Sequence, residues 1–165
     1  MNLSPSQARK CAQTVCSCAH SISIEALQKA PHTVAFTKSF TQALCNHIAE
    51  NGGIVTLEYR IASNRVKSNG GKKLGILDVF AQFGDGSKLA IEIDKGNKVW
   101  SLEKLGLAVE VLRAEAIWIR WRGQIKLVSI PPIFFVDLTV IGNRIPSTQK
   151  VLARERRANE VGHST

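Results

Sequence analysis

The feature that most constrains the fold is a pair of apolar segments joined by a glycine turn. Residues 74–83 and 88–94 are both rich in Leu, Ile, Val, Ala and Phe, and Gly84-Asp85-Gly86 separates them. Apolar, β-rich segments on either side of a glycine turn are typical of a β-hairpin. We therefore predict that these segments form two neighbouring antiparallel strands.

Acidic residues lie inside both predicted strands. Alternation places Glu92 and Asp94 on one face of the second strand, and Asp78 interrupts an otherwise apolar first strand. A carboxylate in a buried strand is costly unless it is paired or binds a cation, so the pattern favours a divalent-metal site. Two alternatives stay open. Asp78 could be a structural acid paired with Arg60 or Lys73, and the other two acids could line the exposed face of an edge strand.

The remaining periodicity predicts helices and strands around this hairpin. Helices are expected at residues 4–30 (one or two), at 34–51, and from Asn97 or Ser101 to Arg113; further strands are expected at 54–62, 116–122, 124–130 and 133–141. This order predicts an α/β fold with a central mixed sheet flanked by helices, in which the strand at 116–122 lies beside the first strand. We expect a helical extension over residues 1–33, a core domain over 34–145 and a basic tail over 146–165.

The charge balance favours a polyanionic partner. Lys and Arg number 22 against 13 Asp and Glu, a formal charge of +9, and nucleic acid is the commonest partner of such a domain. An anionic membrane surface is the rival interpretation, but it would need a basic amphipathic helix that the sequence does not offer. No apolar run of 18 residues and no signal peptide occur, so we expect a cytoplasmic protein without membrane contact.

The cysteines suggest reduced thiols. Three of the four, Cys11, Cys16 and Cys18, crowd into one short segment, which is poor geometry for a disulfide framework. A zinc site that also uses His20 is the alternative, although the spacing matches no common ligand pattern.

The segment GILDVFAQFGDGSKLAIEIDKGNKVWSLEKL resembles the signature of the PD-(D/E)XK nuclease superfamily, an acid in one hairpin strand and acid-x-Lys at the end of the next. The expected helix, three strands, helix and strand also match that family's restriction-endonuclease-like core (αβββαβ), over roughly residues 34–128. The resemblance implies an endonuclease that hydrolyses phosphodiester bonds in DNA, with Mg²⁺ as cofactor and Mn²⁺ as its substitute. By the resemblance, Asp78, Glu92 and the main-chain carbonyl of Ile93 bind the metal.

The sequence departs from the family pattern at three places. Gly-Ile-Leu precedes Asp78 where the family often has Pro. Asp94 stands where the family has lysine, so the strand is similar to the LAIEID strand of very-short-patch-repair endonucleases, and the positive role would move to Lys98 or Lys104. The glutamate that many members carry in the first core helix is absent, and Glu58 could replace it because a neighbouring strand can bring it beside Asp78. The candidate catalytic residues are therefore Asp78, Glu92, Asp94, Lys98, Lys104 and Glu58.

Cations in a glycine-bearing loop before Asp78 are expected to bind nucleic-acid phosphates. These residues are Arg65, Lys67, Lys72 and Lys73. A second set on the following strands would extend the same basic stripe. These residues are Arg120, Arg122 and Lys126.

Two aromatic residues and a histidine are assigned to packing. Trp118 and Trp121 fall on opposite faces of their predicted strand, so one of them is expected in the core. His47 lies on the apolar stripe of its helix and is expected to be a packed core histidine and not a general base.

Three functions are carried forward. The first is a Mg²⁺-dependent endonuclease acting on DNA, with RNA left open and a homodimer left open, since double-strand cleavage by so small a domain would need two copies. The second is a catalytically inactive nucleic-acid-binding module with the same fold. The third is a protein-binding partner such as an inhibitor or immunity factor, although the positive charge argues against a basic toxin as its target.

Overall fold

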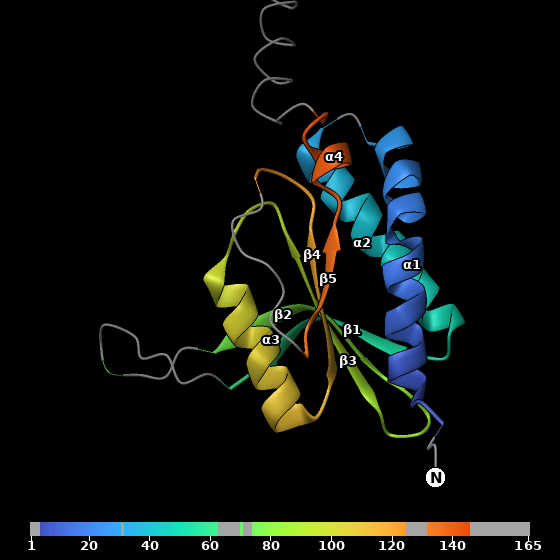
Figure 1. The fold of residues 1–165 in the computed structure, drawn as a ribbon, viewed down its shortest axis with the longest axis vertical. Coiled ribbons are helices and arrows are strands. Elements are labelled where there is room, and N and C mark those ends of the chain that lie inside the picture. Colours follow the sequence, from blue (N-terminus) through green and yellow to red (C-terminus); the bar gives the residue numbers. More distant parts are fainter. Residues whose placement is uncertain (1–3, 31, 63–69, 71–73, 125–131, 146–165) are drawn as a thin grey trace, which may run out of the picture.

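The computed structural model is an α/β fold with a five-stranded mixed sheet between two layers of helices (Figure 1). It describes residues 4–30, 32–62, 70, 74–124 and 132–145. The strands are β1 (Ile54–Ile61), β2 (Gly75–Gln82), β3 (Lys88–Asp94), β4 (Glu115–Arg120) and β5 (Phe134–Asp137). The helices are α1 (Gln7–Gln28), α2 (Thr33–Glu50), α3 (Val99–Leu112) and α4 (Thr139–Gly142). The predicted fold class, a mixed sheet flanked by helices, is confirmed.

The sheet has the strand order β1-β2-β3-β4-β5. β1, β2 and β3 are antiparallel neighbours, whereas β3, β4 and β5 run parallel. Helix α3 is the crossover that joins β3 to β4, because parallel neighbours need such a connection. The predicted hairpin of β2 and β3 is present, with Gly86 at a φ of 80° in its turn.

The sequence-based placement of β4 beside the first strand is wrong. β4 pairs with β3, and its residues from Ala116 to Arg120 are all buried. A strand that is buried on both faces belongs in the interior of a sheet, whereas β1 is mostly exposed and forms an edge.

The strand expected over residues 133–141 is also too long. β5 ends at Asp137, whose carboxylate accepts a hydrogen bond from the Thr139 amide (2.9 Å), and the chain then turns into α4. Such a side-chain bond to the amide two residues on competes with strand pairing. Of the strand expected at 124–130, residues 125–130 lie outside the described part of the chain.

The two N-terminal helices follow from local signals. Ser6 caps α1 by accepting from the Arg9 amide (3.2 Å), as serine commonly does. The buried stripe of α1 consists largely of small residues, among them Ala8, Ala12 and Ala19, so this helix packs closely on α2 and the sheet (Figure 1). Helix α2 ends before Gly52, which has a φ of 85° that L-residues rarely adopt.

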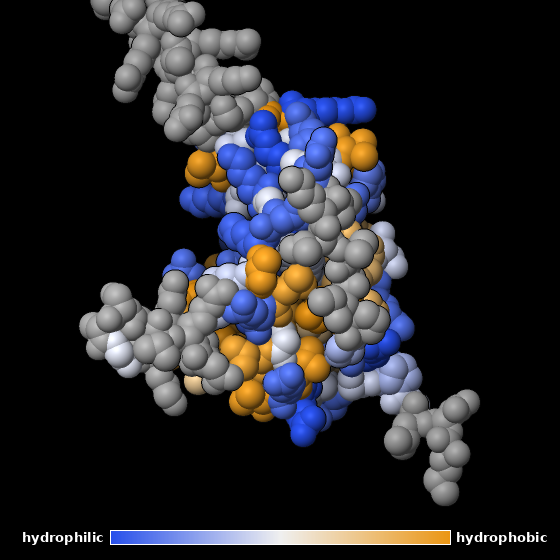
Figure 2. Space-filling model, turned by 60° about the vertical axis from the view of Figure 1, so that its left-hand side comes forward, coloured by the Kyte–Doolittle hydropathy of each residue, from blue (hydrophilic) through white to orange (hydrophobic). Residues whose placement is uncertain are grey.

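The sheet separates two apolar cores. Trp121 lies in the core under α1 and α2, and Trp118 lies in the core under α3. Both tryptophans are therefore buried, where one was expected, because helices cover both faces of the sheet. The outer side of α3 is itself apolar, with Val99 56% and Val111 65% exposed, and Figure 2 shows hydrophobic residues gathered over this face.

Phe36 is expected to be a main support of the α2 layer. Its ring lies 5.0 Å from the Trp121 ring and 5.8 Å from the Phe40 ring, and it is fully buried. Phe36→Ala should lower the free energy of unfolding by about 3–5 kcal/mol, the usual cost of removing a core aromatic ring. Urea unfolding monitored by tryptophan fluorescence measures this loss. Val34→Ala, at a position that is 63% exposed, is the control, and equal losses in both variants would contradict the packing described.

Candidate functional site

The candidate site begins where the alternation of two strands breaks. Leu57 pairs with Val79 and Tyr59 pairs with Leu77, but the intervening Glu58 and Asp78 form no pair. Glu58 has a φ of 52°, in the left-handed region that non-glycine residues rarely adopt. As a result the alternation of side chains shifts by one residue in both strands. In β2, Val79 packs under α1 and α2, whereas Leu77, two residues before it, packs under α3.

Two carboxylates fill the gap that this break opens. Pairing between β2 and β3 ends at Val79 and Ile91, so the amides of Asp78, before Val79, and of Ile93, after Ile91, lie beyond the paired residues. The Ile93 amide donates to Asp78 Oδ2 (2.7 Å), and the Asp78 amide donates to Glu92 Oε1 (3.2 Å). The structure thus brings Asp78 and Glu92 together, each held by backbone next to the other.

Lys104 reaches the same point from α3. Its Nζ donates to Glu92 Oε2 (2.6 Å) and to the Ile76 carbonyl (2.5 Å), and the residue is only 7% exposed. Gly75 makes room for it, because an added Cβ there would lie 2.9 Å from Ile61 Cγ2 and 3.2 Å from Lys104 Cγ. Burial of an ammonium is tolerated here because two acceptors meet it.

Asp94 is bonded to residues outside this group. Its Oδ2 accepts from Trp118 Nε1 (2.8 Å), and its Oδ1 pairs with Lys98 Nζ (2.9 Å). Asp94 is 1% exposed, whereas the Lys98 side chain is 61% exposed. Both carboxylate oxygens are thus engaged, and the pair ties the end of β3 to the start of α3.

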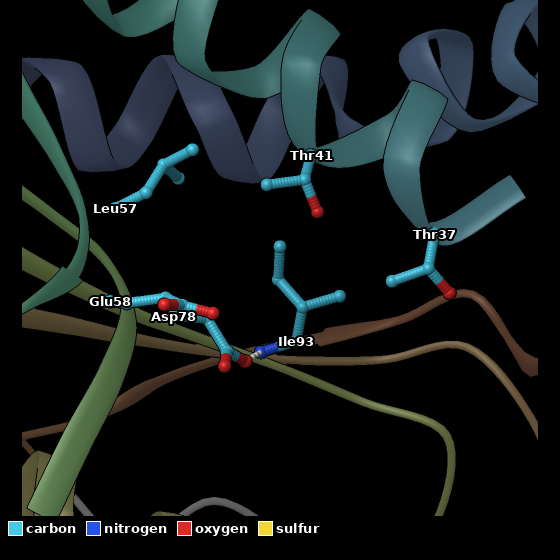
Figure 3. Close-up of a pocket in the computed structure, with 6 residues that line it drawn as sticks. All are labelled: Thr37, Thr41, Leu57, Glu58, Asp78 and Ile93. Carbon is cyan, nitrogen blue, oxygen red and sulfur yellow. Dashed lines mark hydrogen bonds between the residues drawn. The ribbon is translucent and has the colours of Figure 1, made fainter. Parts of the chain in front are cut away.

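Glu58 and Asp78 both line a cavity of about 420 Å³ between α2 and the sheet. Ile93 and Leu57 form its apolar wall, and Thr37 and Thr41 face it from α2 (Figure 3). Figure 3 also shows the Asp78 carboxylate directed at the Ile93 amide. The cavity therefore gives access to Asp78, whereas Glu92 is not one of its lining residues.

Burial raises the pKa values of both carboxylates at this point. Desolvation, followed by the charge of Asp78, raises the pKa of Glu92 from 4.5 to about 7, although Lys104 opposes the shift. Desolvation also raises the pKa of Asp78, against the opposing Ile93 amide and the charge of Lys104. The hydrogen bond to Asp94 is the main cause that raises the pKa of Lys98. A cation near the two carboxylates would relieve their desolvation and mutual repulsion.

The donor set can be compared with what a divalent cation needs. Among the described residues, no group of three or more His, Cys, Asp or Glu side chains is arranged to hold a metal ion. Mg²⁺ often takes only one or two carboxylates and completes its shell with water and phosphate oxygens. Asp78 and Glu92 supply two carboxylates, but both Glu92 oxygens already accept hydrogen bonds, from the Asp78 amide and from Lys104. In the structure one Glu92 oxygen is bonded to Lys104, and Ile93 meets Asp78 through its amide.

Several sequence-based expectations need correction. The edge-strand alternative for Glu92 and Asp94 is wrong, because β3 lies in the middle of the sheet and both residues are 1% exposed. Arg120 is fully buried and cannot contribute to a basic surface stripe. Its guanidinium donates to the Asn97 side chain and to the Arg122 and Gln124 carbonyls instead.

His47 is also placed differently from the prediction. It is half-buried between α1 and α2, with Nε2 3.5 Å from Cys18 Sγ and 3.4 Å from Thr14 Oγ1, so it is a contact between the two helices. The cysteines are free thiols. The predicted phosphate-binding residues of the glycine-bearing loop, and Lys126, lie outside the described residues. The loop residues are Arg65, Lys67, Lys72 and Lys73.

Sequence reasoning missed the threonines of α2. Thr37 and Thr41 are one helical turn apart in TKSFT, and they line the cavity opposite Asp78. Their spacing of four residues puts the two hydroxyls on one side of the helix, next to the apolar Phe36 and Phe40. This pattern could have predicted polar groups of α2 beside the sheet.

Comparison with known proteins gives limited likeness. No family model and no curated protein matches the sequence. A repair endonuclease from Pyrococcus abyssi matches in structure with 17% identity and a TM-score of 0.34, over 58% of this chain and 45% of that chain. This chain therefore spans less than half the length of that protein, and the TM-score is too low to transfer a property from it. No helix of the described residues is long and apolar enough to cross a membrane.

The raised pKa of Glu92 predicts a pH dependence of stability. Between pH 4.5 and about 7 the folded chain keeps a proton that the unfolded chain has released, so the free energy of unfolding falls as the pH rises. Glu92→Gln removes this titration. Relative to that variant, the wild type should lose on the order of 2–3 kcal/mol between about pH 5 and pH 8. Urea unfolding across this pH range measures the difference, and parallel pH profiles of the two proteins would exclude the shift.

Proposed function

We propose that this chain is a divalent-metal-dependent endonuclease that hydrolyses phosphodiester bonds in DNA. The observation that carries the proposal is the reciprocal arrangement of Asp78 and Glu92 in the gap between β2 and β3, with Lys104 bonded to Glu92. A buried carboxylate, a half-buried carboxylate and a buried lysine are an expensive set for a sheet to hold without a chemical use. The positive charge of the chain agrees with a phosphate-rich substrate.

Each residue has a role in this proposal. Asp78 offers its carboxylate to the cavity while the Ile93 amide fixes its orientation. Glu92 would be the second ligand, and Lys104 would supply the positive charge that the family's lysine supplies elsewhere. Glu58, across from Asp78 in the same cavity, would hold a water molecule or a further ligand position.

The chemistry that Mg²⁺ or Mn²⁺ supplies at such a site is activation of water and stabilisation of charge on the phosphate. The chain's own part is to hold the two carboxylates in fixed positions, to keep bulk water away from Glu92 and to neutralise it through Lys104. Asp94 and Lys98 act one step away, since their pair fixes the start of α3 and with it the helix that carries Lys104.

One observation favours a second candidate, an inactive nucleic-acid-binding module. Both Glu92 oxygens already have partners, Lys104 and the Asp78 amide, so a cation would have to compete with an ion pair of 2.6 Å. If that competition fails, the charge of the chain remains but the hydrolysis does not.

Plasmid nicking tests the proposal. Supercoiled plasmid with Mg²⁺ or Mn²⁺ should be nicked by the wild type and not after EDTA is added. Asp78→Ala and Glu92→Ala should each lower the rate by at least about a hundredfold, since each removes a ligand of the reacting centre. Glu110→Ala, which removes an exposed acid of α3, is the control and should retain the wild-type rate. Nicking that survives in both site variants, or no cleavage of either the plasmid or a single-stranded oligodeoxynucleotide by the wild type, would exclude the enzyme.

The passage of Lys104 beside Gly75 allows a second test. Gly75→Val should displace the lysine stem and reduce nicking roughly tenfold or more, and Lys104→Met should reduce it similarly. The double variant should be little worse than either single variant, because both changes act on one contact. Lys98→Met removes an exposed partner of Asp94 and is expected to cost less. Additive losses in the Gly75/Lys104 pair would show that Gly75 does not act through Lys104.

A further inference from the structure

The cavity at Asp78 is one of three that adjoin one another along α2. A second cavity of about 510 Å³ adjoins it and shares Thr37, Thr41 and Leu57 with it. A third, of about 230 Å³, shares Thr37 and Ile93 with it. Thr37 therefore lines all three cavities, and the groove follows α2 past the carboxylates.

The other two cavities of this groove carry positive charge. Lys38 of α2 is exposed and lines the second cavity. Lys95 and Lys98, which follow β3, line the third. In the cavity at Asp78 the α2 wall offers the hydroxyl of Thr41, whereas the Thr37 hydroxyl donates to the Thr33 carbonyl (3.0 Å). Ammonium groups and hydroxyls are the side chains that contact phosphates, whereas the acids at the centre suit a bound cation.

Each of the three cavities has the volume of a small-molecule pocket, which matches single nucleotides placed one after another along the groove. Exposed apolar side chains lie beside the polar groups, Leu57 (52% exposed) and Val34 (63% exposed), which suits the mixed character of unpaired nucleotides.

We propose that a single, unpaired DNA strand lies in this groove, with Lys38 and Lys95 contacting phosphates in the two cavities that adjoin the one at Asp78 and Thr41 donating to a phosphate beside Asp78. The inference rests on the proposed function, because it gives the strand on which the carboxylates would act. It adds what the carboxylates alone do not specify, namely that the substrate enters unpaired.

Binding of the full-length chain in EDTA tests this without requiring catalysis. A short fluorescein-labelled oligodeoxythymidylate and a duplex of matched length are titrated by fluorescence anisotropy over a salt series. The single strand should bind at least about tenfold more tightly than the duplex. Lys38→Ala/Lys95→Ala should bind the single strand about tenfold more weakly, and its log–log salt slope should fall by about 1.4, or roughly 0.7 for each lost phosphate contact. Thr41→Val should weaken binding without changing the slope, because it removes no charge.

The matched control is Lys10→Ala/Lys88→Ala. Both residues lie at the hairpin-turn end of the molecule, where the Gln7 amide of α1 bonds to Asp85 (2.7 Å), away from the groove. This variant should bind like the wild type. The inference is overturned if Lys38→Ala/Lys95→Ala keeps the wild-type affinity and salt slope, or if the duplex binds as tightly as the single strand. Absence of metal-dependent cleavage of both the plasmid and the single-stranded oligodeoxythymidylate, together with the expected binding results, would refute the endonuclease and leave the groove in place.

Discussion

The interrupted ladder between β2 and β3 is the constraint on which the site depends. Main-chain pairing between the two strands stops at Val79 and Ile91, which would leave the Asp78 and Ile93 amides without partners. The Glu92 and Asp78 carboxylates accept from these two amides. A buried amide without a partner costs about as much as a lost hydrogen bond, so the acids are part of the sheet's own bonding. The same bonds hold the two carboxylates beside each other, which links the integrity of the sheet to the geometry of the site.

Charge neutralisation explains the surrounding residues. Two acids in a protein interior repel each other and lose hydration, and Lys104 offsets part of this cost for Glu92 while it also bonds the Ile76 carbonyl. The position of that lysine depends on a glycine in β2 and on a helix whose start is fixed by Asp94. The sheet therefore carries a negatively charged centre that the chain's own cations neutralise only in part. Under this condition the binding of an added cation is most favourable.

The apolar patterning predicted most of the fold. The hairpin of β2 and β3, the helix over α2 and the crossover helix followed in each case from a local period and a local stop signal. The order of the strands could not be predicted in this way. The β2–β3 hairpin leaves one edge of β3 free for pairing, and the apolar pattern does not show that β4 pairs with this edge. The end of β5 was missed for a similar reason, since a side-chain bond at Asp137 decided it.

The sequence by itself determined which residues have the chemistry for the site: Asp78, Glu92 and a nearby lysine. Only the tertiary structure decided that Lys104 pairs with Glu92, while Lys98 pairs with Asp94. Strand alternation predicts faces only while the backbone stays regular, and the left-handed residue in β1 exchanges the faces of two strands at once. That exchange depends on pairing between segments about twenty residues apart, a non-local contact that no local pattern encodes.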